Sequence, residues 1–208
     1  KTAQVVVTVT STTGEIWMDR NLGASQVATA FNDPLSFGHY YQWGMSYSSG
    51  NQVSINGTWD PDGGSTDELA WSTGNGKGLQ DPCPTGFRVP TVGEWEAELT
   101  TWATNDRLGG FGSKLKIPTA GVRFRDDGGL VYDRMGVYWT SELTTRGARS
   151  LYFNETEVNV GDSYRTDGFS VRCIKEVVVE TVTTSTGKVW MDRNLGASQV
   201  ATASDDLG

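Results

Sequence analysis

Four acidic side chains in one polar loop are the first residues whose types and spacing fit a defined chemistry. Asp60, Asp62, Asp67 and Glu68 lie in the glycine-rich stretch 46–82. Calcium prefers several carboxylate and carbonyl oxygens on a flexible loop, so the three aspartates are candidate calcium ligands. Their spacing does not follow the EF-hand pattern, and a solvated acidic loop is the favoured interpretation. The sequence therefore predicts no obligatory cofactor and leaves calcium as an alternative.

The other reactive side chains do not form a recognisable catalytic set. His39 is the only histidine, and no serine or cysteine motif stands near it in the sequence to act as a nucleophile. Glu94, Glu96 and Glu98 resemble a carboxylate cluster, but Glu94 fits helix capping and the other two fit solvent exposure. We therefore expect a protein that is not an enzyme.

The two cysteines, Cys83 and Cys173, are the second feature with defined chemistry. Two buried free thiols would account for them. A single long-range disulfide is favoured, because the chain has the tryptophan- and glycine-rich composition of a surface-exposed domain. Such a bridge would close a loop of about 90 residues, which corresponds to roughly 4–5 kcal/mol in the chain-entropy estimate.

Length and charge limit the class of protein. The chain has 208 residues with a formal net charge of −8, which argues against nucleic acid or an anionic membrane as the partner. No apolar run approaches the ~20 residues that a membrane span needs. Lys1 opens directly onto a β-rich run without a secretion signal, as expected of a mature or excised form.

A repeated segment organises the chain. Residues 14–30, GEIWMDRNLGASQVATA, return at 187–203 as GKVWMDRNLGASQVATA. Fifteen of the 17 positions are identical, and the offset is 187 minus 14, or 173 residues. Such self-similarity indicates a repeat protein. We predict one complete domain over 1–178 and the start of a second repeat over 179–208, which copies 6–35.

The first copy is expected to begin with a hairpin. Residues 4–10 and 15–18 have strand composition and are separated by a polar turn that ends in glycine. Trp17 and Leu22 should be buried in the complete domain. A local ion pair between Asp19 and Arg20 should shape the turn that follows.

Two helices are expected before a series of short strands. Aromatic residues recur near helical spacing over 33–45, which predicts the first helix. The second, over 91–103, begins with a capping box of Thr91 and Glu94 and should end at Asn105, Gly109 and Gly110. Its buried face should contain Val92, Trp95, Leu99 and Trp102.

The order of landmarks between residues 12 and 176 is distinctive: GEIWMDRNLGA, YYQWG, DPCPTGFRVPTVGEWEAEL, GVYWTSE, LYFNETEVNV and YRTDGFSVRCIKE. This series resembles the FISUMP family of bacterial surface domains. The resemblance implies an α+β, C-type-lectin-like fold, in the branch shared with formylglycine-generating, sulfatase-modifying enzymes. Two helices would pack on short, twisted antiparallel sheets with long glycine-rich loops, and the first and last strands would lie together. A Cys83–Cys173 bridge would suit this layout.

The resemblance also implies where a ligand would bind. Members of this fold include variable ligand-binding proteins whose contact positions correspond here to 139–165. The sequence lacks the EPN, QPD and WND motifs of calcium-dependent lectins, and the reactive cysteine pair of the enzyme branch. Tyrosine and arginine are favoured contact residues. The candidate ligand-binding residues are Tyr138, Trp139, Arg146, Arg149, Tyr152, Asn154, Tyr164 and Arg165.

These features together predict an extracellular or cell-surface repeat module without enzymatic activity. It would assemble with copies of itself, in tandem or head-to-tail, into a surface fibre or an adhesin. One alternative is a discrete adhesion or variable-receptor domain that binds a surface glycan or protein; another, disfavoured, is a formylglycine-generating enzyme. The incomplete second copy would expose an apolar strand edge. The candidate assembly residues are Val182, Val189, Trp190, Met191 and Leu195.

Overall fold

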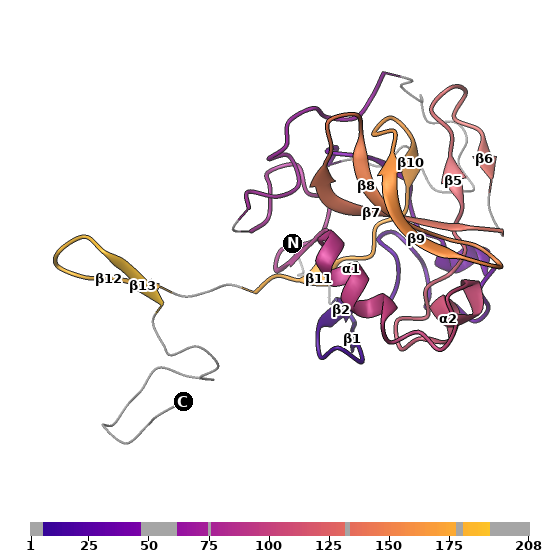
Figure 1. Cartoon of the computed structure of the whole chain (residues 1–208), viewed down its shortest axis with the longest axis horizontal. Helices are drawn as coiled ribbons and strands as arrows, with labels where there is room; N and C mark the ends of the chain where they lie inside the picture. Colours follow the sequence, from indigo (N-terminus) through magenta and orange to yellow (C-terminus); the bar gives the residue numbers. More distant parts are fainter. Residues whose placement is uncertain (1–5, 47–61, 75, 132–133, 178–180, 192–208) are drawn as a thin grey trace. The chain divides into compact units, whose positions relative to one another are not determined.

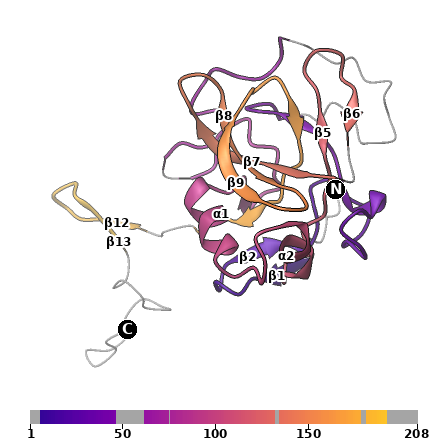
Figure 2. The ribbon, with the colours of Figure 1, turned by 45° about the vertical axis from the view of Figure 1, so that its right-hand side comes forward.

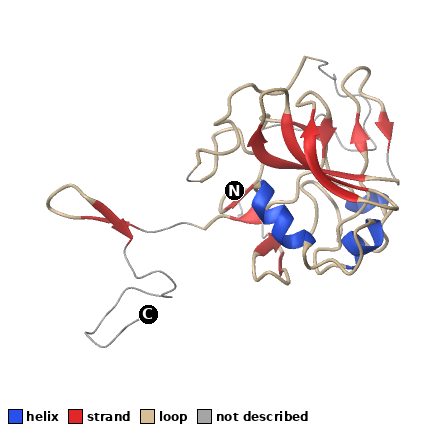
Figure 3. Cartoon of the chain, viewed as in Figure 1, coloured by secondary structure: helices blue, strands red, loops and turns tan. Residues whose placement is uncertain are grey.

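A computed structural model describes residues 6–46, 62–74, 76–131, 134–177 and 181–191 of the chain. The chain forms two compact units, Lys1–Glu176 and Val177–Gly208. In the described part of the first unit, short strands build three antiparallel sheets, and two α-helices pack beside them (Figures 1 and 3). The first unit is therefore a mixed α+β structure with few helices, as the sequence predicts.

The first sheet brings the two ends of the first unit together. Its strand order is β1 (Thr8–Thr10), β2 (Ile16–Met18), β11 (Ile174–Lys175) and β4 (Phe87–Arg88). The predicted hairpin is confirmed, with Val9 opposite Trp17 in the β1–β2 pair. Trp17 in turn lies opposite Ile174 of β11, so the last strand completes the hairpin.

The other two sheets form the centre of the unit. One has the order β3 (Tyr41–Gln42), β10 (Gly168–Phe169), β5 (Val122–Arg123) and β6 (Leu130–Val131). The other has the order β7 (Gly136–Leu143), β8 (Ala148–Phe153) and β9 (Val158–Ser163). In Figures 1 and 2, α1 (Val92–Leu99) and α2 (Arg107–Gly112) lie on one side of the β7–β8–β9 sheet, while β10, β5 and β6 lie on the other.

Strand β7 is covered on both faces because two apolar clusters meet there. Val137 and Trp139 belong to the cluster on the β10 side, and Tyr138 belongs to the cluster that includes Trp95 of α1. Alternate residues of a strand point to opposite faces, so a strand between two clusters is apolar at consecutive positions.

The helix predicted at 91–103 is confirmed in shorter form as α1 (Val92–Leu99), and its capping box of Thr91 and Glu94 is present. The sequence predicts that Asn105, Gly109 and Gly110 end it, but both glycines lie in a second helix, α2 (Arg107–Gly112). A Cβ at Gly109 would lie 1.8 Å from the carbonyl oxygen of Thr104. Glycine is therefore required by close packing at this position rather than by a helix end.

The helix predicted at 33–45 is wrong. The segment has one short 3₁₀ turn, η1 (Pro34–Ser36), and then enters β3. Gly38 and Gly44 have φ values of +75° and +76°, a left-handed conformation that interrupts an α-helix. The aromatic spacing instead reflects a buried turn, in which Phe37 and Tyr40 are fully buried.

The second unit contains one described hairpin, β12 (Thr181–Thr183) and β13 (Val189–Met191). The two strands pair with each other, and in the described residues they form a sheet of two strands only.

Candidate functional site

Strand β11 and helix α1 hold the first hairpin between them. The backbone N–H of Met18 donates to the carbonyl of Cys173 at 2.9 Å, and that of Leu22 donates to Val171 at 2.8 Å. Trp17 is 1% exposed and packs on Trp95 of α1, with ring centroids 4.9 Å apart. Because aromatic side chains bury a large apolar area, this pair contributes strongly to the stability of the contact between the hairpin and α1. The prediction that Trp17 is buried in the complete domain is confirmed.

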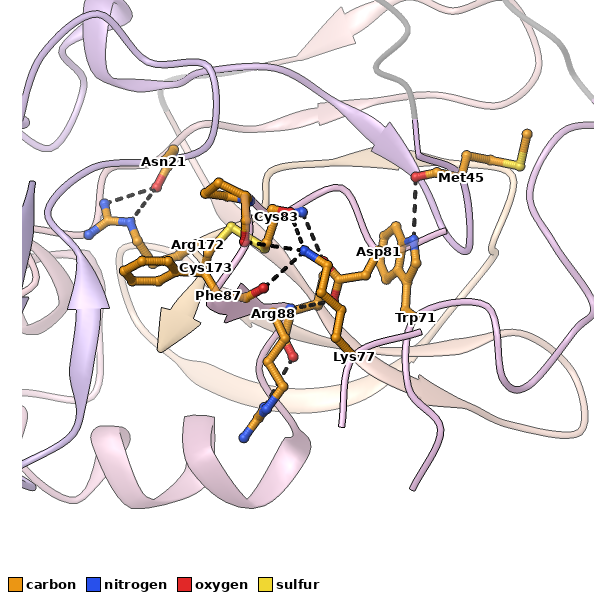
Figure 4. Close-up of a disulfide and its surroundings, with 12 residues drawn as sticks. Asn21, Met45, Trp71, Lys77, Asp81, Cys83, Phe87, Arg88, Arg172 and Cys173 are labelled. Atoms are coloured by element: carbon orange, nitrogen blue, oxygen red, sulfur yellow. Dashed lines mark hydrogen bonds and ion pairs between the residues drawn. A yellow bond between two sulfur atoms is a disulfide. The ribbon is translucent and has the colours of Figure 1, made fainter. Parts of the chain in front are cut away.

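A buried arginine fastens the end of the hairpin. Arg172 is 1% exposed, and its Nε and Nη2 donate to Oδ1 of Asn21 at 3.0 and 2.9 Å (Figure 4). Its Nη1 donates to the carbonyl of Leu115 at 2.7 Å. Burial lowers the pKa of Arg172 to about 10, so the guanidinium remains charged at neutral pH. A buried charge needs good acceptors, and the Asn21 amide oxygen supplies two of the hydrogen bonds.

The structure corrects the prediction that Leu22 is buried. Leu22 is expected from the sequence to be buried, but it is only half-buried, and Asn21 before it is fully buried. The Asn21 amide also donates to Phe37 O and to the Tyr138 hydroxyl, both at 3.0 Å. Its polar atoms are therefore satisfied inside the protein, which makes burial of an asparagine tolerable.

The predicted Asp19–Arg20 pair is confirmed. Two hydrogen bonds of 2.8 Å join the carboxylate to the guanidinium, and Nη1 of Arg20 donates to Ser25 O at 2.9 Å. The pair shapes the turn after β2 and lines a hollow of about 480 Å³, with Val6 and Pro84 among the other lining residues.

Glu98 is expected from the sequence to be exposed, but the structure buries it. One of its carboxylate oxygens accepts a hydrogen bond from the Thr101 hydroxyl at 3.4 Å. Burial raises the pKa of the Glu98 carboxyl, and the side chains of Ser11 in the β1–β2 turn and of Thr101 partly oppose that effect. Glu96 on the opposite side of α1 is exposed, as predicted. We call the site formed by β11, Trp95, Glu98 and Arg172 the hairpin slot.

The second hairpin repeats the first in pairing and register. Val182 lies opposite Trp190 in β12–β13, as Val9 lies opposite Trp17 in β1–β2. The two hairpins are therefore related residue by residue through the offset of 173.

The turns of the two hairpins also match. Ser11 N donates to Glu15 O at 2.8 Å, and Thr184 N donates to Lys188 O at 2.9 Å. The Ser11 and Thr13 hydroxyls share a hydrogen bond of 2.6 Å, and those of Thr184 and Thr186 share one of 2.9 Å. The substitutions between the two copies therefore leave the turn unchanged.

The assembly residues predicted from the sequence have different places. Val182, Val189 and Trp190 lie in the strands β12 and β13. Met191 ends β13 and is 44% exposed. Leu195 lies outside the described residues.

Two of the predicted ligand-binding residues are buried instead. Tyr138 and Trp139 are both 0% exposed, because β7 is covered on both faces. The Tyr138 hydroxyl donates to Pro118 O, and Nε1 of Trp139 donates to Tyr41 O, both at 2.6 Å. These two side chains are core residues and do not contact a ligand at the surface.

The other six candidates are exposed or half-buried and stay a prediction: Arg146, Arg149, Tyr152, Asn154, Tyr164 and Arg165. Nδ2 of Asn154 donates to the Tyr152 hydroxyl at 2.8 Å, which fixes that ring. Of the six, Tyr152 lines a cleft of about 440 Å³ between β5 and the β7–β8–β9 sheet. Phe124 and Phe169 line it too, together with Asn159 and Ser163.

The Cys83–Cys173 disulfide is present, and it joins Cα atoms 5.9 Å apart (Figure 4). Both cysteines are buried, with exposures of 5% and 0%. The bridge links the segment before α1 to the residue before β11 and so reaches the hairpin slot.

An ion pair between the half-buried Lys77 and the buried Asp81 supports the segment that carries Cys83. The Lys77 ammonium lies 3.4 Å from the Asp81 carboxylate and also donates to the backbone carbonyls of Cys83 and Phe87. Asp81 accepts from the N–H groups of Cys83 and Val89, both at 2.8 Å. Burial raises the pKa of Asp81, while these bonds and Lys77 oppose that effect.

The calcium candidates do not form a described site. Asp60 lies outside the described residues, and among those that the structure describes, no group of three or more His, Cys, Asp or Glu side chains is placed to hold a metal ion. His39 is half-buried beside Tyr41, and burial lowers its pKa.

Asn21, Glu98 and Arg172 are not identifiable from the sequence as parts of one site. The sequence feature that points to Asn21 is the run of 14 consecutive identities between the two copies, from Trp17 to Ala30, which includes this residue. No protein-family model matches the chain, and no curated protein sequence or solved structure shows significant similarity to it.

Proposed function

We propose that this chain is a non-enzymatic, extracellular repeat module, joined in tandem or head-to-tail to like modules in a surface fibre or an adhesin. One observation carries the proposal: β12–β13 reproduces β1–β2 in sequence, register and turn hydrogen bonds. In the first unit, β11 and α1 complete the hairpin. A two-stranded hairpin is marginally stable in water and leaves strand edges unpaired. The second hairpin should therefore pack into an equivalent slot.

The proposed location rests on the disulfide. Disulfides persist in secreted and surface proteins and are rare in the reducing cytosol. Among the described residues, no helix has the length and apolarity needed to cross a membrane. We propose membership of the FISUMP family and a C-type-lectin-like fold on the sequence landmarks, supported by the pairing of β2 with β11.

An extended chain tests the repeat proposal. In it, residues 31–176 follow Ala203, so that the second hairpin receives its own β11 and α1. We expect a second domain with a second disulfide, measured as four oxidised cysteines and protected amides in hydrogen exchange. The matched control lacks 181–203 and should leave the added residues unfolded. The proposal fails if the added residues fold equally well in both chains.

A ligand-binding module is the second candidate function, favoured by the cleft beside Tyr152. Phe124 and Tyr152 offer aromatic faces, and Asn159 and Ser163 offer hydrogen-bonding groups, a combination that suits a sugar ring. We expect a glycan array to show binding that Tyr152→Ala lowers at least about tenfold, or about 1.4 kcal/mol. Arg146→Ala, outside this cleft, should bind normally. An array without any bound glycan would contradict this candidate.

A further inference from the structure

We propose that the hairpin slot also accepts the second hairpin of another copy of this chain, in place of its own β1–β2. This inference rests on the proposed function and names the partner and the contacts of the assembly. The slot makes three side-chain contacts with the first hairpin, and each is repeated in the sequence of the second.

The first contact is the tryptophan pair. Trp17 fills the space against Trp95, and its strand pairs with β11 at Ile174. In the second copy the equivalent residue is Trp190, which holds the same register position opposite Val182. A hairpin with a smaller side chain at this position would leave a cavity beside Trp95.

The second contact is the buried arginine. Two of the three Arg172 nitrogens donate to Asn21, four residues after Trp17. An empty slot would leave this buried guanidinium without its main acceptor, a costly state in a protein interior. The first hairpin should therefore leave the slot only when another hairpin takes its place. That second hairpin needs an asparagine four residues after its tryptophan. The second copy has Asn194 at that position.

The third contact concerns the buried Glu98 carboxylate. The Ser11 side chain, in the turn of the first hairpin, is among the groups that lower the pKa of this carboxyl. The equivalent residue, Thr184, retains a hydroxyl group and the same backbone turn. All three contacts therefore have an equivalent in the second copy.

Exchange is close to neutral in energy, because the second hairpin offers the slot the same three interactions that the first hairpin gives up. Val189 has one methylene fewer than the half-buried Ile16, so the chain's own first hairpin is modestly favoured. The described part of each chain has these two hairpins and one slot. Exchange between copies is therefore heterologous and builds open filaments or rings as concentration rises.

A weakened first hairpin makes the exchange measurable in the full chain. Trp17→Ala removes the indole from the chain's own hairpin and leaves Trp190 intact. We expect its apparent dissociation constant for self-association, from light scattering over a concentration series, to fall by about 100-fold or more relative to the parent chain. Trp17→Ala combined with Trp190→Ala should abolish this increase in affinity.

Three outcomes overturn the inference. In the first, the Trp17→Ala chain stays monomeric and is less stable than the parent chain. In the second, it stays monomeric with the stability of the parent chain, because its own second hairpin fills the slot. In the third outcome the double variant associates equally, which marks non-specific aggregation. The extended chain reports on the repeat proposal separately, since its second domain folds whether or not copies exchange hairpins.

Discussion

Replacing Trp95 with alanine is expected to lower the free energy of unfolding of the first unit by about 3–5 kcal/mol. Trp95 is 0% exposed, and its ring centroid lies 4.9 Å from that of Trp17 and 5.8 Å from that of Tyr138. Its indole N–H donates to Trp139 O at 3.3 Å. The substitution would leave a cavity between the hairpin, α1 and β7, and would remove the hydrogen bond to the Trp139 carbonyl.

Urea or guanidinium unfolding followed by tryptophan fluorescence measures this loss. Glu96→Ala is the matched control, because Glu96 is exposed on the same helix and its removal should cost no more than about 0.5 kcal/mol. A Trp95→Ala effect below about 1 kcal/mol would mean that the hairpin slot contributes little to the stability of the unit.

Removal of the disulfide is expected to have an effect of similar size. The two cysteines are separated by 90 residues, and loss of a native bridge from a small secreted domain costs about 2–5 kcal/mol. The double substitution Cys83→Ser and Cys173→Ser should show this loss under oxidising conditions. Neither serine would find a matching polar environment, since both cysteine side chains are buried in an apolar cluster.

Chemical reduction of the parent chain provides the control for the disulfide. Reduction removes the bridge without placing hydroxyl groups in the apolar cluster, so the reduced parent should unfold at a midpoint between those of the oxidised parent and the double variant. Peptide mapping without reduction should recover Cys83 linked to Cys173. Two freely alkylated thiols in native protein would contradict the bridge.

Local patterns that need only neighbouring residues are predicted correctly. The first hairpin has β-branched strands around a turn that ends in Gly14, and α1 begins at the capping box of Thr91 and Glu94. The Asp19–Arg20 pair is adjacent in the chain. Such features depend on backbone geometry and side chains within a few positions, so the sequence specifies them directly.

Features that depend on distant neighbours are predicted poorly. The spacing of Phe37 and Tyr40 predicts a helix, although Gly38 and Gly44 turn the backbone. The prediction that Tyr138 and Trp139 contact a ligand assumes that one face of β7 is exposed to solvent. Two apolar clusters cover that strand, and no short-range pattern indicates the second one.

The sequence by itself determined the repeat, the hairpin that begins each copy and the pair of cysteines available for a bridge. Only the tertiary structure decided what the repeated segment contacts. Asn21 and Arg172 are 151 positions apart, and their hydrogen bonds exist because β2 and β11 pair. Glu98 is buried rather than exposed, although its neighbour two positions away, Glu96, is exposed on the same helix. Burial is a property of the folded surroundings, so residue type and spacing do not specify it.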